Sequence, residues 1–181
     1  MRVLLTGGAG YIGAHTVVEL IAAGHEAVIF DDFSCSSPVA IERINEITGT
    51  QVCNRTIDVT DAEAVRAGID ETGPFDAIIH LAARKAIGES VSLPLEYYEN
   101  NVGSTIVMLA AMREHGISTF LFSGTGTVYT HQEDLPFVET SRTGLALPNP
   151  YSKSKRICEE IMADFARTGP DRRLIGFRYF N

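Results

Sequence analysis

The sequence has little cysteine and no recognisable metal-binding pattern. Its three cysteines, Cys35, Cys53 and Cys158, are odd in number and widely spaced. This usage indicates free thiols in a reducing compartment, and we therefore expect a cytoplasmic protein. The chain contains neither a CxxC pair nor an HExxH motif, and its five histidines form no cluster by spacing. We expect no metal site.

Basic runs and long apolar runs are also missing. The formal net charge is -8 over 181 residues, and an acidic chain without a basic cluster is a poor partner for nucleic acid or an anionic membrane. No window approaches the ~18 apolar residues that span a bilayer. The apolar run that follows Met1 is too short for a signal peptide. With 45% apolar and 21% charged residues, the composition is that of a globular domain.

Short apolar segments alternate with longer segments of helical character. Strands are expected over residues 2–7, 26–32, 50–58, 75–83, 118–124 and 172–181, and helices over 11–25, 38–48, 60–72, 94–116 and 149–168. This alternation predicts parallel strands joined by right-handed crossovers. Six such strands predict an α/β fold with a Rossmann-type doubly wound sheet in the order 3-2-1-4-5-6. Residues 130–148 are expected to form a surface loop near the site.

A glycine-rich segment, LLTGGAGYIG, lies between the first predicted strand and the first predicted helix. Gly7 would allow a tight turn, Gly10 a close approach to a pyrophosphate, and Gly13 close packing of helix on strand. Asp31 ends the second strand, 18 residues after Gly13, where a carboxylate binds the adenosine ribose and repels a 2′-phosphate. The segment therefore predicts NAD rather than NADP. The alternative is that the glycines serve only a turn.

Two further carboxylates each allow two interpretations. Asp32 is either a second cofactor contact or a solvated side chain. Asp58 follows the third strand and either lies near the adenine or neighbours Asp61, which is expected to cap the next helix.

Tyr151 and Lys155 lie four residues apart in NPYSKSKRICEE, and a helix would place them on one face. Taken alone, such a pair is compatible with ordinary helix surface. To act as a base near neutral pH, a tyrosine with a pKa of ~10 needs a shift of about -3 units, worth roughly 4 kcal/mol. A close ammonium and a positively charged nicotinamide are the two sources of such a shift. We therefore expect the Tyr151 pKa to be lowered.

The TGxxGxxG spacing with a downstream YxxxK resembles the extended short-chain dehydrogenase/reductase superfamily. Two stretches, KAIGESVSLPLEYYENNV (85–102) and FRYFN (177–181), narrow the resemblance to the UDP-glucose 4-epimerases, which interconvert UDP-glucose and UDP-galactose. The resemblance covers residues 1–181. It implies a bound NAD, a UDP-hexose substrate, a place in galactose metabolism, and a homodimer formed through helices 94–116 and 149–168.

The resemblance also implies individual roles. Tyr151, Lys155 and Thr125 match the catalytic groups. The substrate-binding positions are Lys85, Thr125, Tyr151 and Asn181. The cofactor-binding positions are Gly7, Gly10, Tyr11, Ile12, Gly13, Asp31, Asp32, Asp58, Val59, Leu81, Ala82, Ala83, Lys85, Asn100, Ser123, Tyr151, Lys155 and Tyr179.

The chain departs from the resembled family in several respects, including one in the fifth strand and one in length. The family usually carries a run of serines and then alanine where this chain has Gly124, Thr125 and Gly126, although Thr125 keeps a hydroxyl. Family members also continue past residue 181 into a smaller region that closes over the nucleotide. We therefore expect residues 1–181 to be the NAD-binding Rossmann domain of a longer protein, with the nucleotide-sugar-binding region absent from this chain.

The same scaffold also serves other functions. A sugar-nucleotide 4,6-dehydratase needs an acid/base pair just after the fifth-strand hydroxyl, and Gly126 and Thr127 cannot supply it. A uronate epimerase or a decarboxylase stays open. A non-catalytic NAD-binding domain is the alternative from a different class, and the Tyr/Lys pair argues against it.

Overall fold

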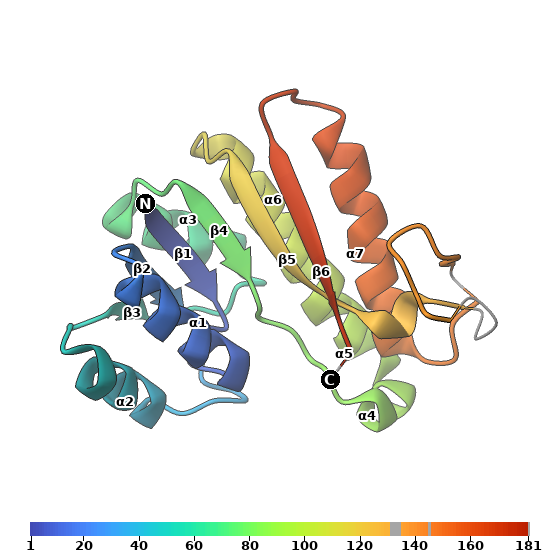
Figure 1. Cartoon of the computed structure of the whole chain (residues 1–181), viewed down its shortest axis with the longest axis horizontal. Coiled ribbons are helices and arrows are strands. Elements are labelled where there is room, and N and C mark those ends of the chain that lie inside the picture. Colours follow the sequence, from blue (N-terminus) through green and yellow to red (C-terminus); the bar gives the residue numbers. More distant parts are fainter. Residues whose placement is uncertain (131–134, 145, 181) are drawn as a thin grey trace.

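A six-stranded parallel sheet forms the centre of the structure, a computed structural model that describes residues 1–130, 135–144 and 146–180 (Figure 1). The strand order is β3-β2-β1-β4-β5-β6, and every pairing is parallel. The predicted fold class and strand order are therefore confirmed. The strands are β1 (Arg2–Thr6), β2 (Glu26–Phe30), β3 (Cys53–Arg55), β4 (Ala77–His80), β5 (Thr119–Thr125) and β6 (Arg173–Tyr179).

Helices cover both faces of this sheet (Figure 1). The side chains of β1 show the arrangement, because Val3 and Leu5 pack with one buried cluster while Leu4 packs with another. The first cluster includes α1 (Tyr11–Ala22) and α2 (Val39–Thr48), and the second includes α3 (Ala62–Thr72), α6 (Ser104–Glu114) and α7 (Pro150–Ala166). Strands covered on both sides need apolar residues at consecutive positions, which explains the continuous apolar runs in the sequence.

Two of the described helices, α3 and α7, begin at polar residues whose side chains cap them. The Asp61 carboxylate accepts hydrogen bonds from the backbone N–H groups of Glu63 and Ala64, both at 3.0 Å, so the predicted cap of α3 is confirmed. Asn149 caps α7 by accepting from the N–H of Ser152 at 2.8 Å. None of the described helices has the length and apolar character needed to cross a bilayer.

Two strands are much shorter than predicted, for identifiable reasons. Strand β3 covers only Cys53–Arg55 rather than 50–58, because the N–H of Val52 bonds to the side chain of Asn45 at 2.9 Å instead of a strand. Strand β4 covers Ala77–His80 rather than 75–83. The N–H groups of Leu81 and Ala82 both turn to the carbonyl oxygen of Thr6, at 3.0 and 3.1 Å, and so end the regular ladder.

The predicted helix 94–116 is divided into three parts. Residues Pro94–Tyr98 form α5, a π-helical turn η1 covers Glu99–Gly103, and α6 follows. A short helix that was not predicted, α4 (Ile87–Ser92), precedes them. Such π-turns often occur at functional sites, and this one holds two asparagines that bind the loop after β4.

The edge strand β6 has one apolar face that is exposed. Ile175, Phe177 and Tyr179 alternate along it and are 44%, 48% and 36% exposed. Leu174, which points the other way, packs against the buried cluster below α7. A row of exposed apolar side chains of this kind marks a surface suited to further contact.

The loop between β1 and α1 depends on the absence of a side chain at position 13, which gives the first prediction. A Cβ built on Gly13 would lie 2.2 Å from the carbonyl oxygen of Gly7 and 2.7 Å from the Cα of Gly8. Both are backbone atoms that cannot move aside, so Gly13→Ala should lower the free energy of unfolding by at least about 2 kcal/mol in urea titrations. Gly88→Ala is the matched control, since nothing lies within 4 Å of its added Cβ. It should be neutral or stabilise by up to ~1 kcal/mol, because alanine favours helix. Equal losses in the two variants would contradict the steric argument.

Candidate functional site

The carboxyl ends of the parallel strands collect most of the predicted site residues at one edge of the sheet. Thr6 is paired with His80, and His80 with Phe122. Strand β5 continues past Phe122 to Thr125, which is paired with Tyr179 of β6. The strand order reverses beside β1, and such a switch point is where open α/β sheets bind ligands.

The glycine loop leads into a helix end that is open to an anion. In the described part of the chain no side chain caps α1, and its first turn holds no acidic residue. This differs from α3 and α7, which have their own caps. The N–H groups at the start of α1, including those of Tyr11, Ile12 and Gly13, therefore carry the positive end of the helix dipole without an internal anion. The Tyr11 side chain is 78% exposed beside this end.

Gly7 is needed for two reasons at once. Its φ of +70° lies in the left-handed region that glycine adopts without strain. A Cβ there would also lie 2.7 Å from the backbone nitrogen of Ala82, so the loop after β4 approaches it closely. Gly8, which the sequence analysis did not single out, sits against the side chain of Ile29 with no room for a Cβ. A Cβ built on Gly10 would lie 3.2 Å from the carbonyl oxygen of Gly7, a tight contact.

Asp31 is buried at the end of β2 and fixes the glycine loop. Its carboxylate accepts hydrogen bonds from the N–H of Ala9 at 2.9 Å, the N–H of Phe33 at 3.0 Å and the hydroxyl of Ser36 at 2.7 Å. The predicted ribose carboxylate therefore lies against the phosphate loop, as the fingerprint requires. Its bonds to the protein also show a structural role that the spacing did not reveal.

The other two carboxylates form local turns. Asp32 is exposed and accepts from both the N–H and the hydroxyl of Ser34, at 2.9 and 2.7 Å. Asp58 is exposed and accepts in the same way from Thr60, also at 2.9 and 2.7 Å. Beside it, Val59 is buried in the core. These bonds fit the interpretations of Asp32 as a solvated side chain and of Asp58 as a neighbour of the α3 cap, and they leave the cofactor roles as predictions.

The loop after β4 is attached to the π-helical turn. Leu81, Ala82 and Ala83 run beside Gly7, and Lys85 is exposed beyond them. The N–H of Arg84 donates to the side-chain oxygens of Asn100 at 3.1 Å and Asn101 at 2.8 Å.

Asn101 is a central residue that the sequence analysis missed. It is 1% exposed, and its amide group donates to the Arg84 carbonyl and to the Ser154 hydroxyl, both at 3.0 Å. Its own carbonyl accepts from the side chains of Thr105 and Cys158. Asn101 therefore ties the loop after β4 to α7 on both sides of Lys155. Its adjacency to Asn100 within the predicted helix 94–116 was the available signal.

Lys155 is buried against the end of β5. It is 3% exposed, its Nζ donates to the Ser123 carbonyl at 2.9 Å, and it lies 4.7 Å from the centre of the Phe122 ring. Burial lowers the pKa of Lys155 to about 8, because an ammonium in an apolar setting favours its neutral form. Ser123 thus contacts the lysine through its backbone.

Tyr151 lies on the same helix, half-buried and facing Thr125. Burial raises the pKa of Tyr151 above its ordinary value, and the Thr125 hydroxyl acts in the opposite direction. The ammonium alone therefore does not give the expected lowering, and the contribution of a nicotinamide stays a prediction. The reason is that a desolvated phenolate is costly, while the Lys155 ammonium is engaged with the Ser123 carbonyl.

His80 forms a buried polar contact below the site and was not predicted. Its Nδ1 lies 2.7 Å from the Thr6 hydroxyl and its Nε2 lies 3.3 Å from the Ser104 hydroxyl. Burial, followed by the charge of Lys155, lowers the pKa of His80 to about 3, so the ring is neutral. No group of three or more potential metal ligands occurs among the residues that the structure describes.

The remaining predicted positions lie at the end of β6. Tyr179 is 36% exposed, with its ring centre 6.5 Å from that of Phe177. Asn181, the predicted contact to the nucleotide sugar, lies outside the described residues.

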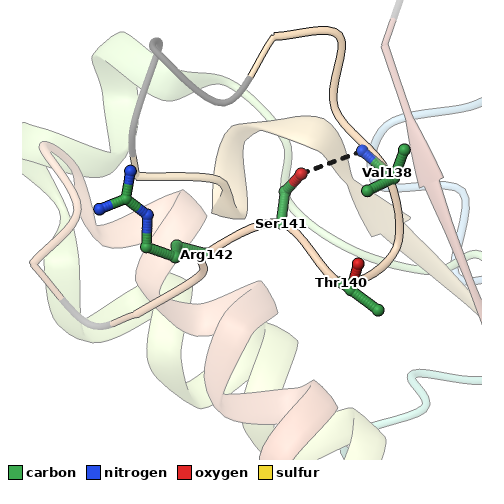
Figure 2. A pocket seen from close by; sticks show the side chains of 4 residues that line it. All are labelled: Val138, Thr140, Ser141 and Arg142. Atoms are coloured by element: carbon green, nitrogen blue, oxygen red, sulfur yellow. Dashed lines mark hydrogen bonds between the residues drawn. The ribbon is translucent and has the colours of Figure 1, made fainter.

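Two hollows of the described surface lie away from this edge of the sheet. One of about 320 Å³ is lined by Val138, Thr140, Ser141 and Arg142 in the loop before α7 (Figure 2). There the Ser141 hydroxyl accepts from the N–H of Val138 at 3.0 Å. Another of about 270 Å³ lies beside His115 and Phe75. Neither is lined by the glycine loop or by Tyr151, so the candidate site is defined by the groups that meet at the strand ends.

The comparisons with known proteins agree with this geometry. A sequence model described as the NAD dependent epimerase/dehydratase family matches residues 3–181. The chain belongs to this family. The UDP-glucose 4-epimerase of Erwinia amylovora is 41% identical over 181 residues, which is 100% of this chain and 53% of the relative. That of Mus musculus is 41% identical over 186 residues and is also covered to 53%.

Solved structures of this epimerase family superimpose on the whole chain. The UDP-glucose 4-epimerase of Bifidobacterium longum, in complex with NAD+ and UDP, gives a TM-score of 0.96 at 41% identity, covering 100% of this chain and 53% of that one. A Stenotrophomonas maltophila UDP-glucose-4-epimerase with bound NAD and formylated UDP-arabinopyranose gives 0.94 at the same identity. The chain thus spans about half the length of the relatives that it matches.

The buried ammonium gives a prediction about stability and pH. The folded pKa of Lys155 lies below its ordinary value of 10.5, so the cost of burying the charge is fully present below pH 8 and disappears as the pH rises toward 10.5. Lys155→Met should therefore raise the free energy of unfolding by roughly 1 to 3 kcal/mol at pH 7. This gain should shrink by pH 9.5 in chemical denaturation. Lys153→Met, a change on the same helix, should shift stability by no more than ~0.5 kcal/mol. A gain that is independent of pH would contradict the assignment.

Proposed function

We propose that the protein containing this chain is an NAD-dependent UDP-glucose 4-epimerase, which interconverts UDP-glucose and UDP-galactose. The observation that carries the proposal is the position of Lys155 and Tyr151. The lysine is bonded to the end of β5, and the tyrosine faces Thr125 at the same strand end. The similarity to UDP-glucose 4-epimerases over the whole chain supports the choice of reaction. A place in galactose metabolism and a cytoplasmic location belong to the same proposal.

The residues at the strand ends suit a dinucleotide. The uncapped start of α1 provides N–H groups for a pyrophosphate. Asp31 stands where the adenosine ribose would lie, and a carboxylate there favours NAD over NADP. Bound NAD would supply the hydride acceptor, and later the hydride donor, at C4 of the sugar. Further contacts are assigned to Asp32, Asp58, Val59, Leu81, Ala82, Ala83, Lys85, Asn100, Ser123 and Tyr179.

In this mechanism Tyr151 exchanges a proton with the sugar 4-hydroxyl. The phenolate takes that proton as C4 is oxidised, which leaves a 4-keto sugar and a neutral phenol. The keto sugar turns over and is reduced on its other face, and Tyr151 returns the proton to the oxygen. Thr125 shares in this hydrogen bonding, because its hydroxyl donates to the Tyr151 oxygen beside the sugar 4-oxygen. Lys155 adds a fixed positive charge, and Lys85 and Asn181 are assigned to the substrate.

We infer that residues 1–181 form the NAD-binding domain and that a further region of the protein covers the exposed face of β6. Ile175 and Phe177 are exposed on that face, beside Tyr179 of the candidate site. The relatives are about twice as long as this chain, and a region of that additional length is large enough to cover this face.

A homodimer through residues 94–116 and 149–168 is also proposed. Of the apolar residues in these helices, Leu109 and Met112 are buried in the core, and Ile161 packs against it. They are therefore not free for a partner. Ile106 is 51% exposed and Leu95 is 70% exposed, and these are the apolar side chains that an interface would cover.

The catalytic assignment is tested by Tyr151→Phe in the complete gene product. The change removes the proton-exchanging oxygen but keeps the ring, so turnover of UDP-galactose should fall at least about 100-fold. NAD binding, followed by fluorescence titration, should stay within about threefold, because the phosphate loop and Asp31 are untouched. Unchanged turnover would remove Tyr151 from the mechanism, and an inactive wild-type protein that binds NAD would contradict the proposed reaction.

The dimer is tested by Ile106→Arg, measured by analytical ultracentrifugation. A buried arginine without a partner is costly at an interface, so the dimer dissociation constant should rise at least tenfold. Ile47→Arg is the control, since Ile47 is 68% exposed on α2 at the far side of the sheet. A dimer that persists unchanged in Ile106→Arg would exclude this surface.

A further inference from the structure

A series of hydroxyl groups connects the first turn of α7 to Thr125. The Ser152 hydroxyl donates to the Thr127 hydroxyl over 2.7 Å. The hydroxyl oxygens of Thr127 and Thr125 lie 3.1 Å apart. Ser152 directly follows Tyr151 in the sequence, so the series runs from the helix turn that carries the tyrosine to the threonine that faces it.

The bond from Ser152 favours one direction for the next bond in the series. A hydroxyl has one proton to donate and two lone pairs that accept. Because Thr127 accepts from Ser152, its own proton is available to donate to Thr125, and we take Thr127 as the donor of that pair. The backbone N–H of Thr127 also donates to the Thr125 oxygen, at 3.3 Å. When Thr127 donates from both its hydroxyl and its N–H, both lone pairs of Thr125 are occupied and its own proton is available to Tyr151, whose pKa the Thr125 hydroxyl lowers.

Burial fixes one end of the series. Ser152 is fully buried, and its backbone N–H is held by the Asn149 cap at 2.8 Å. Thr125 is also buried, at 6% exposure. Thr127 is exposed, so water can reach its hydroxyl when nothing else holds it. Ser152 is therefore the group that decides the direction in which Thr127 donates.

We propose that Ser152 and Thr127 are positioning residues that hold the Thr125 hydroxyl as a hydrogen-bond donor to the oxygen of Tyr151. The proposal rests on the proposed function, in which the Tyr151 phenolate is the base. Hydrogen bonds in a series polarise one another, and a donor stabilises a charged oxygen about twice as well as a neutral one. The two residues would thus favour the phenolate without contacting the substrate.

The test uses Ser152→Ala and Thr127→Val in the complete gene product loaded with NAD. Two pH profiles are measured. One is kcat for UDP-galactose, and the other is the near-ultraviolet tyrosinate band, from which the band of Tyr151→Phe is subtracted. Because loss of the donor raises the phenolate pKa, both midpoints should move upward by roughly half a pH unit. At a pH below the midpoint this corresponds to about a threefold loss of kcat, with KM little changed. Thr127→Ser keeps the hydroxyl and should restore the wild-type midpoints.

Ser90→Ala is the matched control. Ser90 is an equally buried serine of α4, and its hydroxyl donates to the Ile87 carbonyl at 2.6 Å, outside the series. Its loss should lower stability about as much as Ser152→Ala does, while the tyrosinate midpoint stays in place. If Ser152→Ala lowers stability but leaves both midpoints unmoved, the bond is only structural and the proposal is overturned. A wild-type protein that does not turn over UDP-galactose, but whose tyrosinate midpoint moves in Ser152→Ala, would reject the proposed function and keep the positioning role.

Discussion

The buried ammonium of Lys155 is the constraint on which the arrangement of the site depends. The group is 3% exposed and is held by one backbone carbonyl and one aromatic face. A charge in such a place is stable only while these partners keep their positions. Strand β5 must therefore extend past β4 so that Ser123 can present its carbonyl. Helix α7 must also lie at a fixed height along the strand.

Several contacts set that height. Asn101 bonds to Ser154, and Ser154 in turn bonds to the carbonyl of Tyr151, at 3.0 and 2.8 Å. Further along the helix, Glu159 accepts two hydrogen bonds from Arg178 of β6, at 2.9 and 2.8 Å. The Arg178 guanidinium also lies 4.8 Å from the ring centre of Tyr129. Helix α7 is thus braced against the π-helical turn on one side and the edge strand on the other. The polar network makes the helix a rigid base for Tyr151, where a loop would be mobile.

What the sequence could and could not predict follows from the range of the interactions involved. Alternation of strand and helix patterns is local, and it was sufficient for the sheet order and for placing Gly7, Asp31, Tyr151 and Lys155 at one edge. The π-helical turn was missed because it depends on Asn101 bonding to Arg84, a contact between separate elements. The predicted strand β3 was too long because the sequence pattern does not show that the N–H of Val52 donates to the side chain of Asn45. His80 was overlooked because a histidine in an apolar run shows no sign of the hydroxyls of Thr6 and Ser104 that satisfy it.

The Tyr151 pKa shows the same limit and has a functional consequence. Spacing indicated that Lys155 would stabilise the phenolate, but burial dominates in the folded chain and raises the pKa. Lys155 carries its own desolvation cost, since its pKa falls to about 8. The Lys155 ammonium contacts the Ser123 carbonyl and the Phe122 ring, and it is not among the groups that shift the Tyr151 pKa. The group that acts against burial at Tyr151 is the Thr125 hydroxyl. A donor aimed at the phenol oxygen therefore stabilises the phenolate where the buried ammonium does not.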